Sequence, residues 1–333
     1  MNFKPFDRLP ILEWAGWWDK TIERWRGEGL PDVGDRYEIC SYLGVEPFRQ
    51  MWLRPRRAGM PVANRGGPPP VQSADDYERL LPHLYPSPES LTNEWTLWRQ
   101  WAEARGRGEL VLWITLEGFF WFPRTLLGIE GHLYAFYDEP ELMHRMCSDL
   151  ADWHLRIIDA INAIAPPDFM TFAEDMSYNH GPMLSQPLFE QFMAPYYQRV
   201  VPRLRESGTL VLVDSDGDVS AALPWFEAAG VQGLLPLERQ AGVDLAELRR
   251  RHPQMRFIGH FDKMTMTRGE AAMRAEFERL LPIAAQGGYL ISCDHQTPPG
   301  VSLDQYRVYL ELFRDYAHKA GDMSQRLLAD APG

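Results

Sequence analysis

The feature that most constrains the fold is a repeated alternation of short apolar runs with amphipathic helical segments from residue 110 onward. Helix-start signals such as Asp138 with Pro140, or Ser185 with Pro187, follow the polar turns after these runs. Strands that alternate with helices form parallel sheets, because each helix carries the chain back to the start of the next strand. The expected strands are 110–117, 168–175, 209–216, 233–238, 255–262 and 287–295, with a further one near 50–55.

This alternation predicts an α/β fold, a TIM (β/α)8 barrel formed by residues 1–333 as a single domain. Residues 1–100 are its Trp-rich N-terminal portion, and residues 110–318 are its core βα units. A doubly wound sheet is the alternative, but neither GxGxxG nor GxxxxGKS/T opens any helix of the chain. The Pro- and Gly-rich segment 63–73 predicts a loop.

Eight of the twelve tryptophans lie in residues 1–101, seven of them in the N-terminal portion and the eighth at Trp101. Residues 13–26 place Trp14, Trp17, Trp18, Ile22 and Trp25 at steps of three and four, which predicts a helical extension with one largely aromatic face. So much aromatic surface packs either against the barrel itself or against a second subunit. A homodimer is therefore one of two open alternatives.

Composition narrows the class of protein. The net charge of −12 argues against nucleic-acid partners, because an acidic surface repels phosphate. Three scattered cysteines, without CxxC spacing, exclude a disulfide framework and an all-cysteine zinc site. The start lacks the regions of a signal peptide, and no stretch approaches the length of a membrane span. These features predict a cytoplasmic globular protein with a small-molecule substrate.

Each apolar run ends in an acid or a histidine, and these residues are the candidate site. The carboxyl ends of parallel strands open onto one face of a barrel, where the loops assemble the active site. Carboxylates also favour helix N-caps, which explains any single position but explains all six runs less well. The residues are Glu117, Glu174, Asp175, Asp214, Asp216, Glu238, His260, Asp262, Asp294 and His295.

Residue type and strand parity suggest roles. Asp214, Asp216 and Asp218 share one face of the expected strand, because side chains alternate along a strand. Two carboxylates and a histidine hold a divalent metal, or serve without metal as a general acid/base set. No GxSxG elbow is present for a nucleophilic serine. We expect Glu174, Asp175, His260 and Asp262 to be catalytic, and Glu117, Tyr178, His180 and Glu238 to bind substrate.

Residues 259–316, with GHFD, a Gly-Gly-Tyr strand and a later pair of prolines, resemble the C-terminal part of the uroporphyrinogen decarboxylase superfamily. The part from about residue 110, with FAEDM and VDSDGD, is similar as well, so the resemblance covers roughly two-thirds of the chain. It implies a TIM barrel. The opening DRLPILEWAGWWDKTIERWRGEGLP is similar to a poorly characterised branch of the superfamily.

True decarboxylases of the superfamily carry a Met-Arg-Gln-Ala-Gly-Arg motif that is not present in the matching stretch FRQMWLRPRRAGMP. An acidic barrel mouth is also a poor receptor for a substrate with many carboxylates. The resemblance therefore points away from heme synthesis. It points to the second chemistry of the superfamily, methyl transfer with zinc and a corrinoid or thiol.

Those methyltransferases carry a His-x-Cys and a later Cys, and the matching positions here are Asp214, Asp216 and His295. The resemblance implies that these three hold Zn²⁺ or another divalent ion. The implied reaction moves a methyl group from a small methoxy or methylamine substrate to a corrinoid on a partner protein, with Glu174 or His260 as acid for the leaving group.

Two alternatives remain open. One is a cofactor-independent decarboxylase of a small acid, which would use Lys263 or Arg239 with Asp262. In either enzyme, an ion pair of Lys263 with Asp262 is a structural possibility. The other alternative is a non-catalytic binding subunit.

Overall fold

The computed structural model describes residues 1–60 and 67–329, so the predicted loop at 63–73 lies partly outside the described residues. Its internal contacts divide the chain into two compact units. We call Met1–Pro47, Asp216–Ser220 and Leu234–Gly333 the terminal unit, and Phe48–Ser215 with Ala221–Gly233 the central unit. That residues 1–333 act as one domain stays a prediction.

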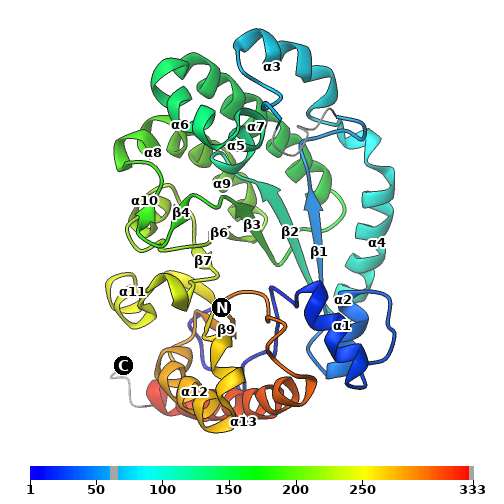
Figure 1. Ribbon diagram of the computed structural model, residues 1–333, viewed down its shortest axis with the longest axis vertical. Helices are drawn as coiled ribbons and strands as arrows, with labels where there is room; N and C mark the ends of the chain where they lie inside the picture. Colours follow the sequence, from blue (N-terminus) through cyan, green and yellow to red (C-terminus); the bar gives the residue numbers. More distant parts are fainter. Residues whose placement is uncertain (61–66, 330–333) are drawn as a thin grey trace. The chain divides into compact units, whose positions relative to one another are not determined.

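The main sheet confirms the predicted fold class, an α/β fold of the TIM-barrel type. Its order is β1-β2-β3-β6-β7-β8-β9, and every pair whose register is defined is parallel. Each strand lies at or beside an expected apolar run (Figure 1). The bounds are β1 Phe48–Leu53, β2 Val111–Glu117, β3 Phe169–Ala173, β6 Leu210–Asp214, β7 Gly233–Leu235, β8 Arg256–Phe261 and β9 Tyr289–Cys293.

The described residues form seven strands in this sheet, where the sequence predicts eight. An extended N-terminal segment lies beside the end of β9, with a parallel bridge between Trp17 and Thr297. The backbone N–H of Trp14 donates to the side chain of Ser292 instead of to a backbone carbonyl. The segment therefore follows β9 without the regular ladder that defines a strand.

Helices of the central unit follow the apolar periodicity of the sequence. In α7 (Pro140–Asn162), Leu142, Met146, Leu150 and Trp153 are buried at helical spacing. The helix expected from Ser185 is interrupted at Met193 and becomes α8 and α9. The other helices are α3 Ala74–Leu80, α4 Thr92–Gly106, α5 Trp121–Leu127, α6 Ile129–Asp138, α8 Gln186–Phe192, α9 Ala194–Glu206 and α10 Leu223–Ala228, and β4 Ser177–Tyr178 pairs with β5 Gly181–Pro182.

The terminal unit contains β8, β9 and the C-terminal helices. Phe277 of α12 stacks on Tyr309 and Tyr316 of α13, which holds these two helices side by side (Figure 1). The helices are α1 Asp19–Gly27, α2 Arg36–Leu43, α11 Leu245–Arg251, α12 Glu270–Ala284 and α13 Leu303–Ala329, with 3-10 turns at Arg239–Ala241 and Lys263–Arg268.

The helix expected at 13–26 is wrong in its first half, because α1 begins at Asp19 and the residues before it are extended. Trp17 and Trp25 nevertheless pack together and against Tyr306 of α13. Packing within the terminal unit thus accounts for these two rings without a second subunit. Trp18, by contrast, is 48% exposed.

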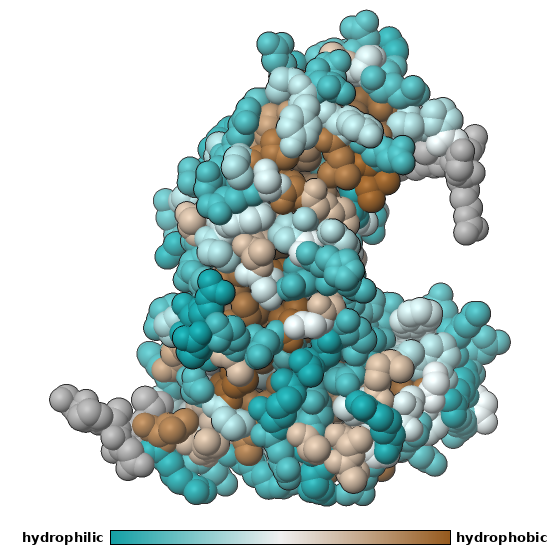
Figure 2. Space-filling model, turned by 60° about the vertical axis from the view of Figure 1, so that its left-hand side comes forward, coloured by the Kyte–Doolittle hydropathy of each residue, from teal (hydrophilic) through white to brown (hydrophobic). Residues whose placement is uncertain are grey.

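The surface is mainly hydrophilic on the face in Figure 2. Among the described helices, none combines the length and the apolar character needed to cross a bilayer.

Replacing Trp25 by Ala tests the internal packing of the aromatic N-terminus. The Trp25 side chain is fully buried, so we expect its loss to lower the free energy of unfolding by about 3–5 kcal/mol. Trp18→Ala is the matched control, with an expected change within about 1 kcal/mol because the ring is half exposed. Urea titration measures both, and equal effects of the two substitutions would contradict this packing.

Candidate functional site

Three of the predicted site residues meet in the terminal unit. Single ligand atoms of Asp216, Glu238 and His295 all lie within 4.8 Å of one another. They follow the carboxyl ends of β6, β7 and β9, which is where side chains from different parallel strands converge. We call these three residues the carboxylate–histidine trio.

The spacing of the trio suits a small cation. Nε2 of His295 lies 3.5 Å from Oδ2 of Asp216. Two ligand atoms at about 2.0–2.1 Å from a tetrahedral zinc ion are separated by about 3.3 Å, so this distance is close to that of a filled site. All three side chains are half-buried, which leaves a face of the site accessible to a substrate.

The electrostatics of the trio also favour a positive charge between its members. Burial raises the pKa of Glu238, and the neighbouring Asp216 carboxylate raises it further. The hydrogen bond with Asp216 raises the pKa of His295, because it favours the charged imidazolium. A positive charge between the three groups, whether a proton on His295 or a bound cation, is therefore favoured.

Backbone geometry beside His260 fixes the direction of Glu238. Nδ1 of His260 lies 2.7 Å from the carbonyl oxygen of Leu237. The backbone N–H of His260 donates to the carbonyl of Pro236. Leu237 and His260 both have a left-handed φ, +60° and +65°. The Glu238 carboxylate itself accepts the N–H of Gly217 at 2.9 Å. Glu238 is thus held from its own backbone and from the segment that carries Asp216.

His260 is buried, and burial lowers its pKa to about 3. At neutral pH its ring carries one proton. If that proton is on Nδ1, where Leu237 can accept it, Nε2 is a hydrogen-bond acceptor. Nε2 has no partner among the described residues. This arrangement suits a base or a ligand better than the proton donor that the sequence suggested.

A buried ion pair lies next to the trio. Lys263 contacts Asp294 at 3.0 Å, so the possible pairing with Asp262 is wrong for this lysine. Asp294 also accepts the backbone N–H of Arg239 at 3.1 Å, and this ties the residues after β7 to those after β9. The positive charge of Lys263 lowers the pKa values of Glu238 and His295, so its field reaches the trio.

Asp262 caps the 3-10 turn that follows β8. One oxygen accepts the N–H of Met264 and a bond from Gln240, and the other pairs with Arg268 at 2.9 Å. These contacts explain the residue structurally, as an N-cap does. Its predicted catalytic role stays a prediction.

The carboxylate of Glu174, in the central unit, is buried among four donors. It accepts the backbone N–H groups of Phe119, Phe120 and Trp121 at 2.7–3.1 Å and the hydroxyl of Tyr197. Burial raises its pKa to about 7 although these bonds oppose the shift. The carboxylate therefore stabilises the turn between β2 and α5. This structural role holds whether or not Glu174 also acts as an acid or a base.

The other predicted residues of the central unit lie at strand ends. Glu117, at the end of β2, pairs with Arg56 and has one buried oxygen without a partner among the described residues. The carbonyl of Asp214 accepts the N–H of Glu174, and the carbonyl of Asp175 accepts a bond from Arg124. Their roles as ligand, acid or substrate contact stay predictions.

Tyr178 and His180 belong to the small β4–β5 hairpin. Both are exposed, and their rings meet edge to face at 5.7 Å. They form a polar aromatic pair on a short hairpin, where a role in substrate binding stays a prediction.

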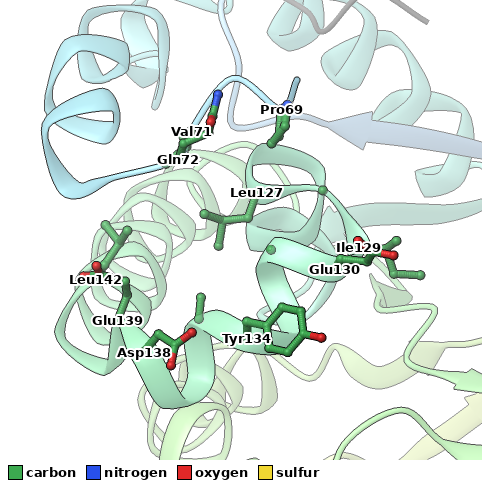
Figure 3. Close-up of a pocket in the computed structure, with 13 residues that line it drawn as sticks. Pro69, Val71, Gln72, Leu127, Ile129, Glu130, Tyr134, Asp138, Glu139 and Leu142 are labelled. Atoms are coloured by element: carbon green, nitrogen blue, oxygen red, sulfur yellow. The ribbon is translucent and has the colours of Figure 1, made fainter. Parts of the chain in front are cut away.

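A separate pocket of about 610 Å³ opens around α6 in the central unit (Figure 3). Leu127, Ile129 and Tyr134 contribute apolar walls, and Glu130 and Asp138 contribute acids. None of the residues predicted from the sequence lines this pocket.

Sequence reasoning placed Asp214 with Asp216 and His295 and assigned Glu238 to the substrate. The set of three came from the family resemblance, and strand parity placed Asp214 and Asp216 on one face; β6 ends at Asp214, so the alternation does not extend to Asp216. The ion pair of Asp294 with Lys263 and the bond that Asp294 accepts from the Arg239 N–H were not predicted. Glu238 was identified as a site residue because an acid or a histidine follows each apolar run.

Comparisons with known proteins agree with the fold. A family model described as uroporphyrinogen decarboxylase (URO-D) matches residues 123–316. Among solved structures, a methyltransferase from Methanosarcina mazei is similar with a TM-score of 0.62 and 14% identity, over 94% of this chain and 95% of that one. At this identity the similarity shows the fold alone.

A second structure, described as a vitamin-B12-independent methionine synthase from Listeria monocytogenes, has a TM-score of 0.42 and 10% identity, over 97% of this chain and 98% of that one. That TM-score is too low to support an argument. No curated protein matches the sequence.

Gly118→Ala tests the turn that Glu174 fixes. A Cβ atom at Gly118 would lie 2.1 Å from the carboxyl carbon of Glu174, so the carboxylate would have to leave its four donors. We expect the free energy of unfolding to fall by at least about 2 kcal/mol. Gly131→Ala in α6 is the control, since its Cβ would meet nothing closer than 3.9 Å and alanine favours helix. Equal stability of both variants in urea would contradict the tight approach.

Proposed function

Because the chain belongs to the uroporphyrinogen decarboxylase family, whose model matches residues 123–316, we propose that it is a metal-assisted methyltransferase of that family. Its substrate is a small methoxy or methylamine compound, and its methyl acceptor is a corrinoid carried by a partner protein. The observation that carries the proposal is the carboxylate–histidine trio.

The donor set of the trio suits zinc or another divalent ion. Two carboxylate oxygens and one imidazole nitrogen form a harder site than thiolates would, and such a site prefers oxygen or nitrogen in its open position. When bound there, the ion would act as a Lewis acid towards the ether oxygen or amine nitrogen of the substrate. Asp216, Glu238 and His295 would hold it, with Glu238 in the place that the family resemblance assigned to Asp214.

Residues around the trio would support the departure of the leaving group. Lys263, whose side chain is mostly buried, carries a positive charge whose field reaches Glu238 and His295. A cation in that position stabilises negative charge that develops on a leaving oxygen. The unprotonated Nε2 of His260 would accept a hydrogen bond from the substrate or from a bound water.

Measuring the metal content of variants tells the trio apart from the set that the resemblance implied, in which Asp214 replaces Glu238. The parent protein, purified without chelators or a histidine tag, is expected to bind one equivalent of zinc or a similar ion. Glu238→Gln and His295→Ala should each weaken binding by at least about 100-fold, because a ligand is lost. Asp218→Asn is the matched control: it lies in the same segment outside the trio, and it keeps the oxygen that accepts the N–H of Ser220.

Asp214→Asn decides between the two ligand sets. Retained binding in this variant supports the trio, and loss of binding restores Asp214 as a ligand. A parent protein that takes up no metal even after reconstitution contradicts the proposal.

Turnover is tested with a methyl-accepting Co(I) corrinoid protein and methoxylated or methylated amine substrates. We expect methyl transfer that chelation abolishes and the metal restores. Release of carbon dioxide from a small acid after exhaustive chelation would instead establish the metal-free decarboxylase.

A further inference from the structure

The N-terminal segment from Glu13 to Thr21 has no part in the proposed reaction, yet it contacts the loop that carries His295. This loop runs from the end of β9 at Cys293 to Thr297. All the residues concerned belong to the terminal unit.

The start of the loop is held by Glu13 and Trp14. The indole N–H of Trp14 donates to the carbonyl of Cys293 at 2.7 Å. Its backbone N–H donates to the hydroxyl of Ser292 at 3.3 Å, and that hydroxyl donates in turn to Glu13 at 2.6 Å. The same Glu13 oxygen accepts the backbone N–H of Cys293 at 3.1 Å.

Glu13 is itself fixed from the other side. Its second oxygen accepts the hydroxyls of Tyr306 and Tyr309 of α13, at 3.0 and 3.4 Å. The side chain is fully buried, and a buried carboxylate is stable only when its oxygens are satisfied in this way. The contact between the N-terminal segment and β9 is therefore specific, beyond what apolar packing requires.

The end of the loop is held by the next residues of the segment. The N–H of Thr297 donates to the carbonyl of Gly16 at 3.1 Å, and the hydroxyl of Thr21 donates to the carbonyl of Thr297 at 2.8 Å. His295 thus lies between two anchored points, both provided by residues about 280 positions earlier in the chain.

Trp14 also touches His295 directly. The two rings meet edge to face, with centroids 6.2 Å apart and an interplanar angle of 89°. Edge-to-face contact restricts the rotation of the imidazole about its χ angles. The imidazole is the member of the trio whose orientation matters most, because its nitrogen lone pair lies in the ring plane.

We propose that Trp14, held by Glu13, is a positioning residue that fixes the imidazole of His295 in the direction of Asp216 and Glu238. The inference rests on the proposed metal centre and adds the N-terminal segment to it. Groups that orient a metal-binding histidine change metal affinity by about 10–100-fold when they are removed.

Trp14→Phe is the test variant, since it removes the indole N–H and shortens the ring while keeping a buried aromatic side chain. Trp17→Phe is the matched control in the same segment. Trp17 packs on Trp25 and Tyr306, and its indole nitrogen has no hydrogen-bond partner among the described residues. Both variants are first compared with the parent protein by urea unfolding, so that metal affinities refer to folded protein.

The dissociation constant for Zn²⁺ is measured by competition with a chromophoric chelator. We expect Trp14→Phe to weaken binding about tenfold and Trp17→Phe to change it by less than about twofold. The visible spectrum of the Co²⁺-loaded protein should change in Trp14→Phe alone, because a tilted imidazole alters the ligand field. Amide exchange at Thr297 in the metal-free protein should likewise accelerate in Trp14→Phe alone.

Ser292→Ala provides a second route if Trp14→Phe does not fold. It removes the hydroxyl that links Trp14 to Glu13, and the same three readouts should move in the same direction by a smaller amount. Zinc affinity and Co²⁺ spectra that are unchanged in both, or that change equally in the Trp17 control, overturn this inference and leave the metal centre standing. A parent protein that binds no zinc overturns the proposed function and this inference with it.

Discussion

Two carboxylates and an imidazole share a space in which their ligand atoms lie within 4.8 Å of one another, and this crowding is the constraint on which the candidate site depends. Two negative charges at such a distance repel, and half-burial strengthens the repulsion. Burial raises the pKa of Glu238 and the neighbouring Asp216 carboxylate raises it further, while the hydrogen bond with Asp216 raises the pKa of His295. A divalent cation relieves the same repulsion more completely than a protonated histidine does.

Keeping three polar groups this close together requires that each side chain is held in place, and contacts around the trio do this. Glu238 is fixed through the left-handed residue Leu237 and the ring of His260. His295 follows Asp294, which is tied to Lys263 and to the backbone of Arg239. These contacts are made by buried or half-buried groups, where a hydrogen bond or an ion pair is exchanged least with water.

The sequence was sufficient to predict the strands, because apolar runs of parallel sheets are buried on both faces and end in polar residues. It also predicted which strand ends carry acids. It failed where backbone departs from regular geometry. Trp14 and Trp17 have helical spacing but lie in extended chain, because hydrogen bonds to β9 replace those of a helix turn. The local periodicity of a sequence does not predict hydrogen bonds to a strand that lies about 280 positions later in the chain.

Two of the three members of the trio, Asp216 and His295, were predicted as ligands, and Glu238 was not. Strand parity groups Asp214 with Asp216, yet the strand ends between them, so the rule no longer applies where the site begins. Leu237, directly before Glu238, has a left-handed φ, and leucine is not a residue type in which such a conformation is expected. The positions of the strand ends could therefore be predicted from the sequence. The backbone conformation after each strand, which sets the direction of the site side chains, could not.

The most direct test of the metal centre is X-ray absorption spectroscopy of the zinc-loaded protein. The trio predicts a first shell of nitrogen and oxygen at about 2.0–2.1 Å, with the multiple-scattering pattern of a single imidazole. His295→Ala should remove that imidazole pattern. Sulfur at about 2.3 Å, or a shell of oxygen alone in the parent protein, would contradict a centre built from Asp216, Glu238 and His295.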